Sequence, residues 1–222
     1  MEIAPLLNIV RGVTAIIGSG GKTTLLYTLA EELKEKGSVI ICTSTHIRIP
    51  ERYNTVTGGT AELEEALNEN KVVCAGTPVE NGKLTAAGIS FEELENIADY
   101  VLVEADGSKG LPLKAHADHE PVIPDNTENT ILVIGADGIG RRVSDVCHRP
   151  EIWKSITGTD MNDAVTPEDI AKVITTEDLG DIVLINKAES DADREQAGKL
   201  AEKLNRPVVI GSLQRKEYIK WQ

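Results

Sequence analysis

Aromatic residues are scarce in this sequence. Its 222 residues include one Phe, two Trp and four Tyr, whereas 41% of all residues are apolar. A core built from this chain must therefore consist mainly of Ile, Val, Leu and Ala. Such an aliphatic composition is typical of buried parallel strands under helices, which read as continuous apolar runs. The length fits one α/β domain.

Basic residues are also few compared with acidic ones. The 36 Asp and Glu outnumber the 23 Lys and Arg, which gives a formal net charge of −13. A nucleic-acid surface needs clustered Lys and Arg to neutralise phosphates, and anionic lipid attracts basic segments. The charge therefore argues against both nucleic acid and membrane as partners.

Cysteine pairs and long apolar runs are missing as well. Cys42, Cys74 and Cys147 are odd in number and widely spaced, and they form no CxxC motif, which excludes a disulfide framework. Cys42 and Cys74 lie within apolar runs, where a thiol behaves as a small hydrophobic group. No apolar run approaches the ~18 residues of a membrane span, and no signal peptide precedes the first strand. We expect a cytoplasmic protein.

Short apolar runs rich in β-branched residues alternate with helical patterns along the chain. This alternation predicts βαβ units, and hence a three-layer α/β/α fold with a mostly parallel sheet flanked by helices. Ser90 and Thr166 are typical helix starts, and Gly37 is a typical stop. The expected strands are 13–17, 39–42, 72–75, 100–103, 131–134, 182–185 and 208–210, and the expected helices are 24–36, 61–68, 91–97, 167–175 and 193–204.

Two segments do not follow this alternation. Residues 107–129 contain Pro and His but little apolar periodicity, and residues 137–163 are irregular apart from a short apolar patch around Ile152 and Trp153. Loops of this length inside a compact domain are usually functional or mobile. We predict a single domain over residues 1–222 with irregular insertions at about 107–129 and 137–163.

A glycine-rich turn stands between the first expected strand and the first expected helix. Glycines permit positive φ and let backbone N–H groups surround phosphate oxygens, and the start of a helix adds partial positive charge. In such a turn Lys22 would contact the β- and γ-phosphates, Thr23 would bind Mg²⁺ and Thr24 would contact the α-phosphate. The turn therefore predicts Mg²⁺ with ATP or GTP as cofactors. Its sequence is Gly18-Ser19-Gly20-Gly21-Lys22-Thr23-Thr24.

The turn differs from the standard GxxxxGK[ST] pattern, because the position that should hold the first glycine is Ile16. It reads Gly-x-x-Gly-Lys-Thr instead, which is shorter by two residues at its entrance. This compact form resembles the loop of the Mur-ligase family of ATP-dependent ligases. Strand, glycine turn, Lys-Thr and helix still follow one another in the required order. That order favours a P-loop NTPase-like fold over an ordinary strand-to-helix turn.

Two carboxylates follow the apolar run 100–103, namely Glu104 and Asp106. In P-loop enzymes a carboxylate at the C-terminal end of a strand holds Mg²⁺, directly or through water. The string Glu-Ala-Asp-Gly also resembles the Glu-x-x-Gly motif of metallochaperone-type GTPases, whose glycine N–H senses the γ-phosphate. We predict Lys22, Glu104 and Asp106 as catalytic residues. Thr23, Glu104 and Asp106 are the candidate metal ligands, with one of the two carboxylates as the primary ligand.

Two further strand ends carry polar groups. His46 closes a Thr-Ser-Thr-His string after the second strand and is a candidate for contact with substrate or phosphate, although a hydroxyl-rich turn that satisfies its own backbone is an equal alternative. Asn186, Lys187 and Glu189 follow a late strand and resemble the Asn-Lys-x-Asp motif with which GTPases read guanine. Because Glu189 replaces the Asp, the choice between ATP and GTP stays open.

Cationic and proton-donating groups gather in the irregular segments of this acidic chain. They suit an anionic second substrate, for instance a phosphate-bearing pterin or selenophosphate, and the alternative is a set of scattered surface cations. No spacing of four ligands indicates structural zinc. The groups are Lys109, Lys114, His116, His119, His148 and Arg149. Of these, Lys109, Lys114, His116, His119 and Arg149 join His46 as predicted substrate contacts.

The string from Glu104 to Pro124, together with the strings at 147–150 and 165–170, is similar to the YqeC family. Members of that family are described as accessory proteins for selenium-dependent molybdenum hydroxylases. The resemblance runs from the glycine turn to Asn186 and Lys187. It implies a single P-loop α/β domain and a role in making or inserting a selenium-containing molybdenum cofactor. The matching positions are Lys22, Thr23, Glu104, Asp106, Lys114 and Arg149.

These observations together predict a Mg²⁺-dependent P-loop nucleotide-binding protein or NTPase. The resemblance implies a place in the maturation of selenium-dependent molybdenum hydroxylases. Its partners would be a nucleotide, a selenium- or molybdopterin-containing small molecule, and a molybdenum hydroxylase. Two alternatives remain open: a Mur-ligase-like ligase or small-molecule kinase, and a non-catalytic, nucleotide-gated cofactor carrier.

Overall fold

The computed structural model describes residues 1–221. Its centre is a nine-stranded sheet in which neighbouring strands are parallel, except for the antiparallel edge pair of β13 and β14. Strand β1 lies in the middle of the sheet between β10 and β8. The strand order is β14 (Glu217–Trp221), β13 (Val208–Ser212), β12 (Ile182–Asn186), β10 (Thr127–Gly135), β1 (Gly12–Gly18), β8 (Tyr100–Glu104), β2 (Val39–Thr43), β5 (Val72–Ala75) and β4 (Asn54–Val56).

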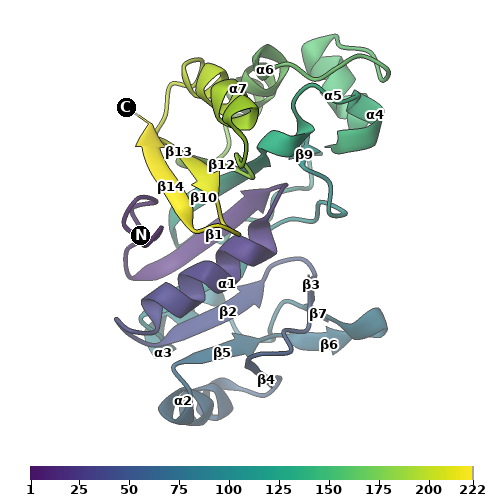
Figure 1. Cartoon of the computed structure of the whole chain (residues 1–222). Helices are drawn as coiled ribbons and strands as arrows, with labels where there is room; N and C mark the ends of the chain where they lie inside the picture. The colour runs from purple at the N-terminus through teal and green to yellow at the C-terminus, as the bar shows by residue number, and fades with distance from the viewer. Residues whose placement is uncertain (222) are drawn as a thin grey trace.

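Helices cover both faces of this sheet. On one face α1 (Lys22–Leu33) crosses the central strands, in front of the sheet in Figure 1, and buries Leu25, Leu29 and Leu33. The core of the opposite face includes apolar side chains of four other helices. These are α2 (Thr60–Glu69), α3 (Phe91–Ile97), α6 (Pro167–Glu177) and α7 (Asp191–Ala201). The chain therefore has the predicted three-layer α/β/α fold of the P-loop type.

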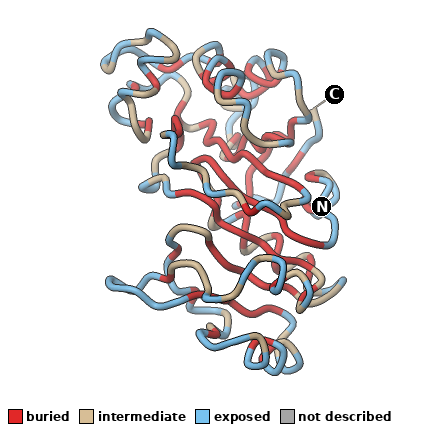
Figure 2. The backbone as a smooth tube through the Cα atoms, turned by 180° about the vertical axis from the view of Figure 1, so that it is seen from behind, coloured by how far each residue is buried: buried red, intermediate tan, exposed pale blue. Residues whose placement is uncertain are grey.

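The core is aliphatic and is divided by the sheet into two halves. In β1 every residue is buried, and side chains alternate between the faces: Ile16 belongs to the core under α1, whereas Ala15 and Ile17 belong to the other half. This period of two follows from the strand pleat. Figure 2 shows the buried backbone concentrated along the central strands and the exposed backbone in the loops around them.

The seven predicted strands and five predicted helices are confirmed, with shifted ends. Ser90 and Thr166 cap α3 and α6 as predicted, each through a capping box in which the third helical residue donates its N–H to the cap hydroxyl. Helix α1 ends at Leu33, three residues before the predicted end, and Gly37 donates its N–H to Leu33 O across 3.0 Å. Cys42 and Cys74 are buried, as predicted for core thiols.

The two irregular segments are more ordered than the sequence indicates. In the first, β9 (Leu113–Lys114) pairs in parallel with β11 (Cys147–His148) from the second. The second also contains the 3₁₀ turn η2 (Ala136–Gly138), α4 (Val143–Val146) and α5 (Pro150–Thr157). Helix α5 escapes prediction because it is only two turns long, with Trp153 as its buried anchor. The pairing of β9 with β11 brings both segments to the same end of the sheet.

Several short strands were also absent from the sequence prediction. Strands β4 and β14 extend the two edges of the main sheet, and a three-stranded sheet projects beside β2. The small sheet consists of β3 (Ile47–Arg48), β6 (Thr77–Val79) and β7 (Lys83–Thr85), with the 3₁₀ turn η1 (Glu80–Gly82) between the last two. Strands β3, β4, β6 and β7, with two or three residues each, give too little periodicity to be found from sequence. Of the described helices, none combines the length and apolar character that a bilayer crossing requires.

Candidate functional site

The glycine turn links β1 to α1 at the carboxyl end of the sheet. Gly18, Gly20 and Gly21 have φ of 90°, 88° and 139°, values that side chains rarely tolerate. A Cβ on Gly20 would lie 2.3 Å from the backbone nitrogen of Gly135, and one on Gly21 would lie 2.4 Å from Asn186 Nδ2. The backbone of the turn therefore packs directly against the ends of β10 and β12, and only glycine fits there.

Lys22 is the first residue of α1, and its side chain is 3% exposed. Its ammonium group donates to Gly18 O across 2.8 Å and lies 3.1 Å from Asp106 Oδ1 and 3.9 Å from Glu104 Oε1. The lysine thus bends back over the turn, and two carboxylates from the end of β8 neutralise it. All three predicted catalytic side chains lie together.

Thr23 and Glu104 are the pair closest to the open cleft. The Thr23 hydroxyl donates to Glu104 Oε2 across 2.9 Å, and both residues line a cleft that runs along the glycine turn. Burial raises the pKa of Glu104 more than the neighbouring Lys22 and Thr23 lower it. A hydroxyl and a carboxylate side by side are the oxygen ligands that Mg²⁺ prefers. Their chemistry therefore fits the expected metal.

Asp106 has a different environment, because its side chain is completely buried. Its Oδ2 accepts hydrogen bonds from Gly18 N at 2.9 Å, Lys114 Nζ at 2.9 Å and His116 Nε2 at 2.8 Å. Burial alone would raise the pKa of Asp106, but His116, Lys22 and Lys114 together hold it well below its usual range. Asp106 anchors the turn from behind, whereas Glu104 is the carboxylate that faces the cleft.

Lys114 and His116, predicted as substrate contacts, both lie buried among carboxylates of the protein. Lys114 donates to Gly107 O across 2.6 Å and forms ion pairs with Asp106 and Glu120, and its side chain is 1% exposed. His116 lies between Asp106 and the Glu177 carboxylate, whose Oε2 is 2.7 Å from His116 Nδ1. Both side chains are occupied by the protein's own carboxylates. They support the turn from inside.

Burial and the neighbouring carboxylates shift the pKa of His116 in opposite directions. Desolvation lowers the pKa of His116, but its hydrogen bonds to Asp106 and Glu177 raise the pKa by more. The two carboxylates therefore favour the charged form of the His116 ring. Through it, Glu177 at the end of α6 is connected to the glycine turn.

Arg149 belongs to a second group of ion pairs, together with Glu120 and Lys114. Its guanidinium binds Glu120 with two hydrogen bonds, NH1 to Oε2 at 2.7 Å and NH2 to Oε1 at 2.9 Å, and Glu120 also pairs with Lys114. Burial raises the pKa of Glu120, but Arg149 and Lys114 lower it by more. His119 is exposed, and its Nε2 is 3.5 Å from Arg149 NH2. It is not among the residues that line the cleft along the turn, and its predicted contact with a substrate stays a prediction.

The cleft continues past the turn into a second compartment. The first compartment lies along the turn, and Thr24 and Lys187 also line it. The second lies against the start of α5, and the two share His46, Lys83 and the segment 107–109. Sequence reasoning missed Lys83, because its place on the short strand β7 gave no signal that it faces the cleft. His46 and Lys109 lie at the junction of the two compartments.

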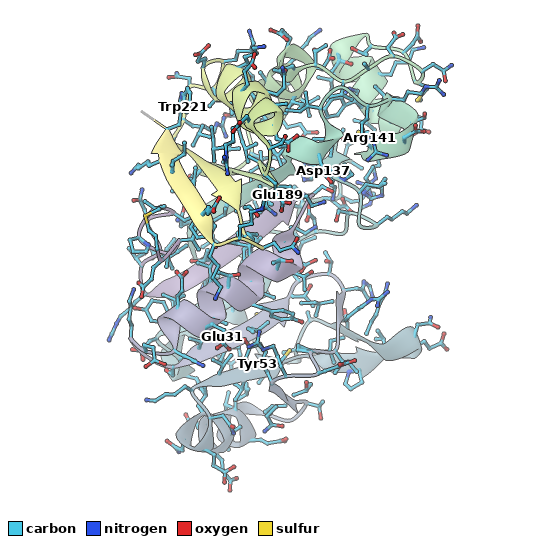
Figure 3. The ribbon with its side chains drawn as sticks, viewed as in Figure 1. Glu31, Tyr53, Asp137, Arg141, Glu189 and Trp221 are labelled. Carbon is cyan, nitrogen blue, oxygen red and sulfur yellow. The ribbon has the colours of Figure 1, made fainter. Side chains whose placement is uncertain are left out.

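The Asn186 to Glu189 segment supports the turn from the β12 side. Asn186 Nδ2 donates to Gly20 O across 2.9 Å, and its Oδ1 accepts from Leu213 N at 3.0 Å, so both polar atoms of its side chain are bonded within the protein. Lys187 pairs with Asp137 at 2.9 Å. Glu189 accepts a hydrogen bond from Ser212 Oγ at 2.9 Å. Figure 3 labels Asp137 and Glu189 in this region of the molecule.

Ser19 differs from its neighbours in the turn. Its hydroxyl donates to Leu111 O, its N–H donates to Val133 O across 2.8 Å, and the residue is 1% exposed. The side chain and the N–H of Ser19 thus both face the protein interior. Among residues 1–221, no three His, Cys, Asp or Glu side chains are grouped as a metal site.

A family model described as YqeC protein matches residues 14–151. The chain belongs to the YqeC family. The matched region contains the glycine turn, Glu104, Asp106 and the segment up to Arg149, but it stops before Asn186. The matched region thus includes the turn, the first irregular segment and the first part of the second.

Individual relatives agree with this membership. The chain is 34% identical to the uncharacterized protein YqeC of Escherichia coli K12 over 155 residues, which are 66% of this chain and 60% of that protein. It is 29% identical to the ATP-dependent dethiobiotin synthetase BioD of Aquifex aeolicus over 134 residues, which are 54% of this chain and 59% of that protein. The matches thus span about 60% of either relative's length.

A solved structure also resembles this chain, at lower sequence identity than these two relatives. The 54 kDa protein of the signal recognition particle from Aeropyrum pernix K1, in complex with GDP, aligns with a TM-score of 0.40 and 14% sequence identity. The alignment covers 96% of this chain and 44% of that chain.

Proposed function

We propose that this YqeC-family protein binds a nucleoside triphosphate with Mg²⁺ at the glycine turn and cleaves its terminal phosphate bond. The observation that carries the proposal is the arrangement of Lys22, Thr23 and Glu104. They meet at the start of α1, next to a turn whose backbone only glycine can form. The same elements in the same order bind phosphates in P-loop enzymes.

Each group has a role in this proposal. Backbone N–H groups of the turn and the positive end of α1 bind phosphate oxygens. Lys22 exchanges its internal partners for the β- and γ-phosphates. Thr23 and Glu104 hold Mg²⁺, which when bound neutralises phosphate charge and orients the oxygens. Asp106, which takes no place in the cleft, keeps the Gly18 N–H and Lys22 in position.

A thermal-shift panel tests this proposal. The full chain is heated with ATP, GTP, ADP or GDP, each with and without Mg²⁺. A ligand that binds only the native state raises the melting temperature by mass action. We expect stabilisation by at least one triphosphate that grows when Mg²⁺ is present. Absence of any nucleotide-dependent shift, together with no heat of binding in calorimetry, would contradict the proposal.

We further propose that the protein serves the maturation of selenium-dependent molybdenum hydroxylases, the role that the sequence resemblance implies. The supporting feature is the string 104–124, which folds directly beside the turn and supplies Asp106, Lys114 and Glu120. Phosphate release is measured with and without a molybdenum-hydroxylase apoprotein. Stimulation by the apoprotein supports the role, and a rate that the apoprotein leaves unchanged counts against it.

A ligase or kinase is a second candidate function, favoured by the second compartment of the cleft. A group bound there lies on the continuation of the space beside Lys22 and Thr23. The relative BioD carries the description of an ATP-dependent synthetase. A phosphorylated or ligated small-molecule product would select this function over hydrolysis. Slow turnover with tight, nucleotide-dependent binding of the hydroxylase would select the gated carrier.

The organisation into one domain is also part of the proposal. All the strands that flank the turn belong to one sheet, and the irregular segments pair with each other through β9 and β11. Single-step unfolding in urea, with coincident fluorescence and circular dichroism transitions, is the expected result for residues 1–222.

A further inference from the structure

The second compartment of the cleft has a sign of charge opposite to that of the whole protein. It lies between the small sheet and the start of α5, and its lining includes a set of basic side chains. The chain as a whole has a formal net charge of −13. The titratable side chains used in the following argument are His46, Lys83, Lys109, Glu120, His148 and Arg149.

Glu120 and Glu151 offset part of the positive charge of this lining but leave an excess from Lys83, Lys109 and Arg149. Both oxygens of Glu120 are already bound, Oε1 by Arg149 and Oε2 by Arg149 and Lys114. Glu151 also lines the compartment, as a single exposed carboxylate. His46, Lys83 and Lys109 are exposed side chains. Cationic side chains that line the same compartment repel one another unless an anion binds between them.

His148 and Arg149, on the α5 side, also belong to the lining of this compartment. His148 Nδ1 is buried and has no hydrogen-bond partner, and burial, Lys114 and Arg149 lower the pKa of His148. Arg149 is the N-cap of α5 with a φ of 64°, and no side chain caps this helix start. Such a φ is uncommon for a residue with a Cβ and is maintained only where the surroundings favour it. The helix start adds partial positive charge to the compartment.

We infer that the second compartment binds the phosphate-type dianion of a small-molecule second substrate, next to the triphosphate at the glycine turn. The inference rests on the proposed nucleotide site and names the class of molecule that shares its cleft. A dianion fits better than a carboxylate, because several separate donors surround one space and a phosphate group offers three acceptor oxygens. His46, Lys83 and Lys109 lie between the two sites, since both compartments include them.

The test uses the full chain with its glycine turn occupied. Mg²⁺ and a non-hydrolysable triphosphate analogue fill the turn, including the γ-phosphate position, so that added phosphate has no vacant place there. Inorganic phosphate is then titrated and followed by melting temperature and by ³¹P NMR. Sodium acetate and sodium chloride at equal ionic strength serve as monoanion arms. We expect a saturable response to phosphate alone.

Two variants locate the response. Arg149→Gln removes the guanidinium beside Glu120, and we expect about tenfold weaker phosphate binding, the effect of one charge-assisted contact. Because Arg149 is half-buried, a second variant, Lys83→Gln, changes an exposed lysine on β7 and should weaken binding in the same direction with an unchanged melting temperature. Lys220→Gln, an exposed lysine on the edge strand β14, is the matched control and should bind phosphate as the wild type does.

The outcomes separate the two proposals. If the triphosphate analogue stabilises the protein but phosphate gives no response beyond that of acetate, the second site is wrong and the nucleotide site stands. Equal phosphate affinity in wild type, Lys83→Gln and Arg149→Gln also overturns the second site. If the analogue itself gives no stabilisation, the proposed function fails, and this inference fails with it.

Discussion

Lys22 is neutralised by the protein itself, since its ammonium group is bound by Gly18 O and lies close to Asp106 and Glu104. A triphosphate therefore has to compete with these groups. Asp106 keeps two other cationic partners, Lys114 and His116, when Lys22 is removed. The side chain can be deleted without leaving a buried carboxylate alone, which makes it a clean probe of phosphate binding.

Replacement of Lys22 by alanine should weaken nucleotide binding roughly 100-fold, because contacts between an ammonium group and phosphate contribute about 3 kcal/mol in total. Isothermal calorimetry with Mg²⁺ and a triphosphate measures the change. Lys34→Ala, at the C-cap of the same helix, removes a half-buried lysine that pairs with Glu31 and should leave the affinity unchanged. Equal affinities for the two variants would exclude Lys22 from the phosphate site.

Gly20 is the position at which the turn tolerates least change. A Cβ on Gly20 would lie 2.3 Å from the Gly135 backbone, and the residue has a φ of 88°. Gly140 has a similar φ of 78°, but the space around it is open. Gly140→Ala therefore measures backbone strain alone, about 1 kcal/mol. Gly20→Ala should lower the free energy of unfolding by clearly more. Urea denaturation of both variants gives the comparison, and equal losses would show that the turn can move away from β10.

Among the elements, α6 has the least expected connection to the site. The carboxylate of its last residue, Glu177, forms hydrogen bonds with the main-chain N–H and with the Nδ1 of His116. The other ring nitrogen of His116, Nε2, is hydrogen-bonded to Asp106. The raised pKa of His116 gives this chain a pH dependence. A group whose pKa is higher in the folded than in the unfolded state stabilises the fold when it is protonated in both states.

The sign of this pH dependence follows directly. Stabilisation by His116 is fully present below its unfolded pKa of about 6.5 and is lost as the pH rises through its higher folded pKa. His116→Gln should remove this loss, so that unfolding free energy changes less between about pH 6 and about pH 9 than in the wild type. His119→Gln, an exposed histidine three residues away, should keep the wild-type slope. An unchanged slope in His116→Gln would mean that the imidazolium contributes no stability.

The elements that carry their own pattern could be predicted from the sequence. The β-branched runs gave the seven long strands, and hydroxyl caps at Ser90 and Thr166 gave the starts of α3 and α6. Helix α5 and strands β9 and β11 have no such pattern, because they are short and are held by tertiary contacts such as the burial of Trp153. The same limit applies to the site. The chemistry of Lys114 and His116 is visible in the sequence, but their complete burial by Asp106, Glu120 and Glu177 is not.

At the scale of the whole molecule, sheet order brings distant segments together. Because β8 and β10 flank β1, the carboxylates after β8 and the backbone at the end of β10 both reach the glycine turn. Strand β12 comes next, so Asn186 reaches Gly20 from 166 positions away in the sequence. Local motifs predicted that each strand end is polar. The pairing order, which depends on crossovers far apart in sequence, could not be read from any of them.

Glu189 provides the test of base recognition at this scale. Its Oε1 accepts from Ser212 Oγ, and Arg215 donates to its backbone oxygen, so the residue joins β12 to the segment after β13. Glu189→Gln keeps an oxygen for Ser212 but loses the carboxylate that would accept two hydrogen bonds from guanine. If the Asn-Lys-x-Glu segment reads the base, this variant should reduce the GTP-to-ATP affinity ratio about tenfold and leave the melting temperature unchanged. Ser212→Ala, which removes the structural hydrogen bond but keeps the carboxylate, should lower the melting temperature and preserve the ratio. If the GTP-to-ATP affinity ratio changes in Ser212→Ala but not in Glu189→Gln, the Glu189 carboxylate has only a structural role, and other residues of the cleft select the nucleotide.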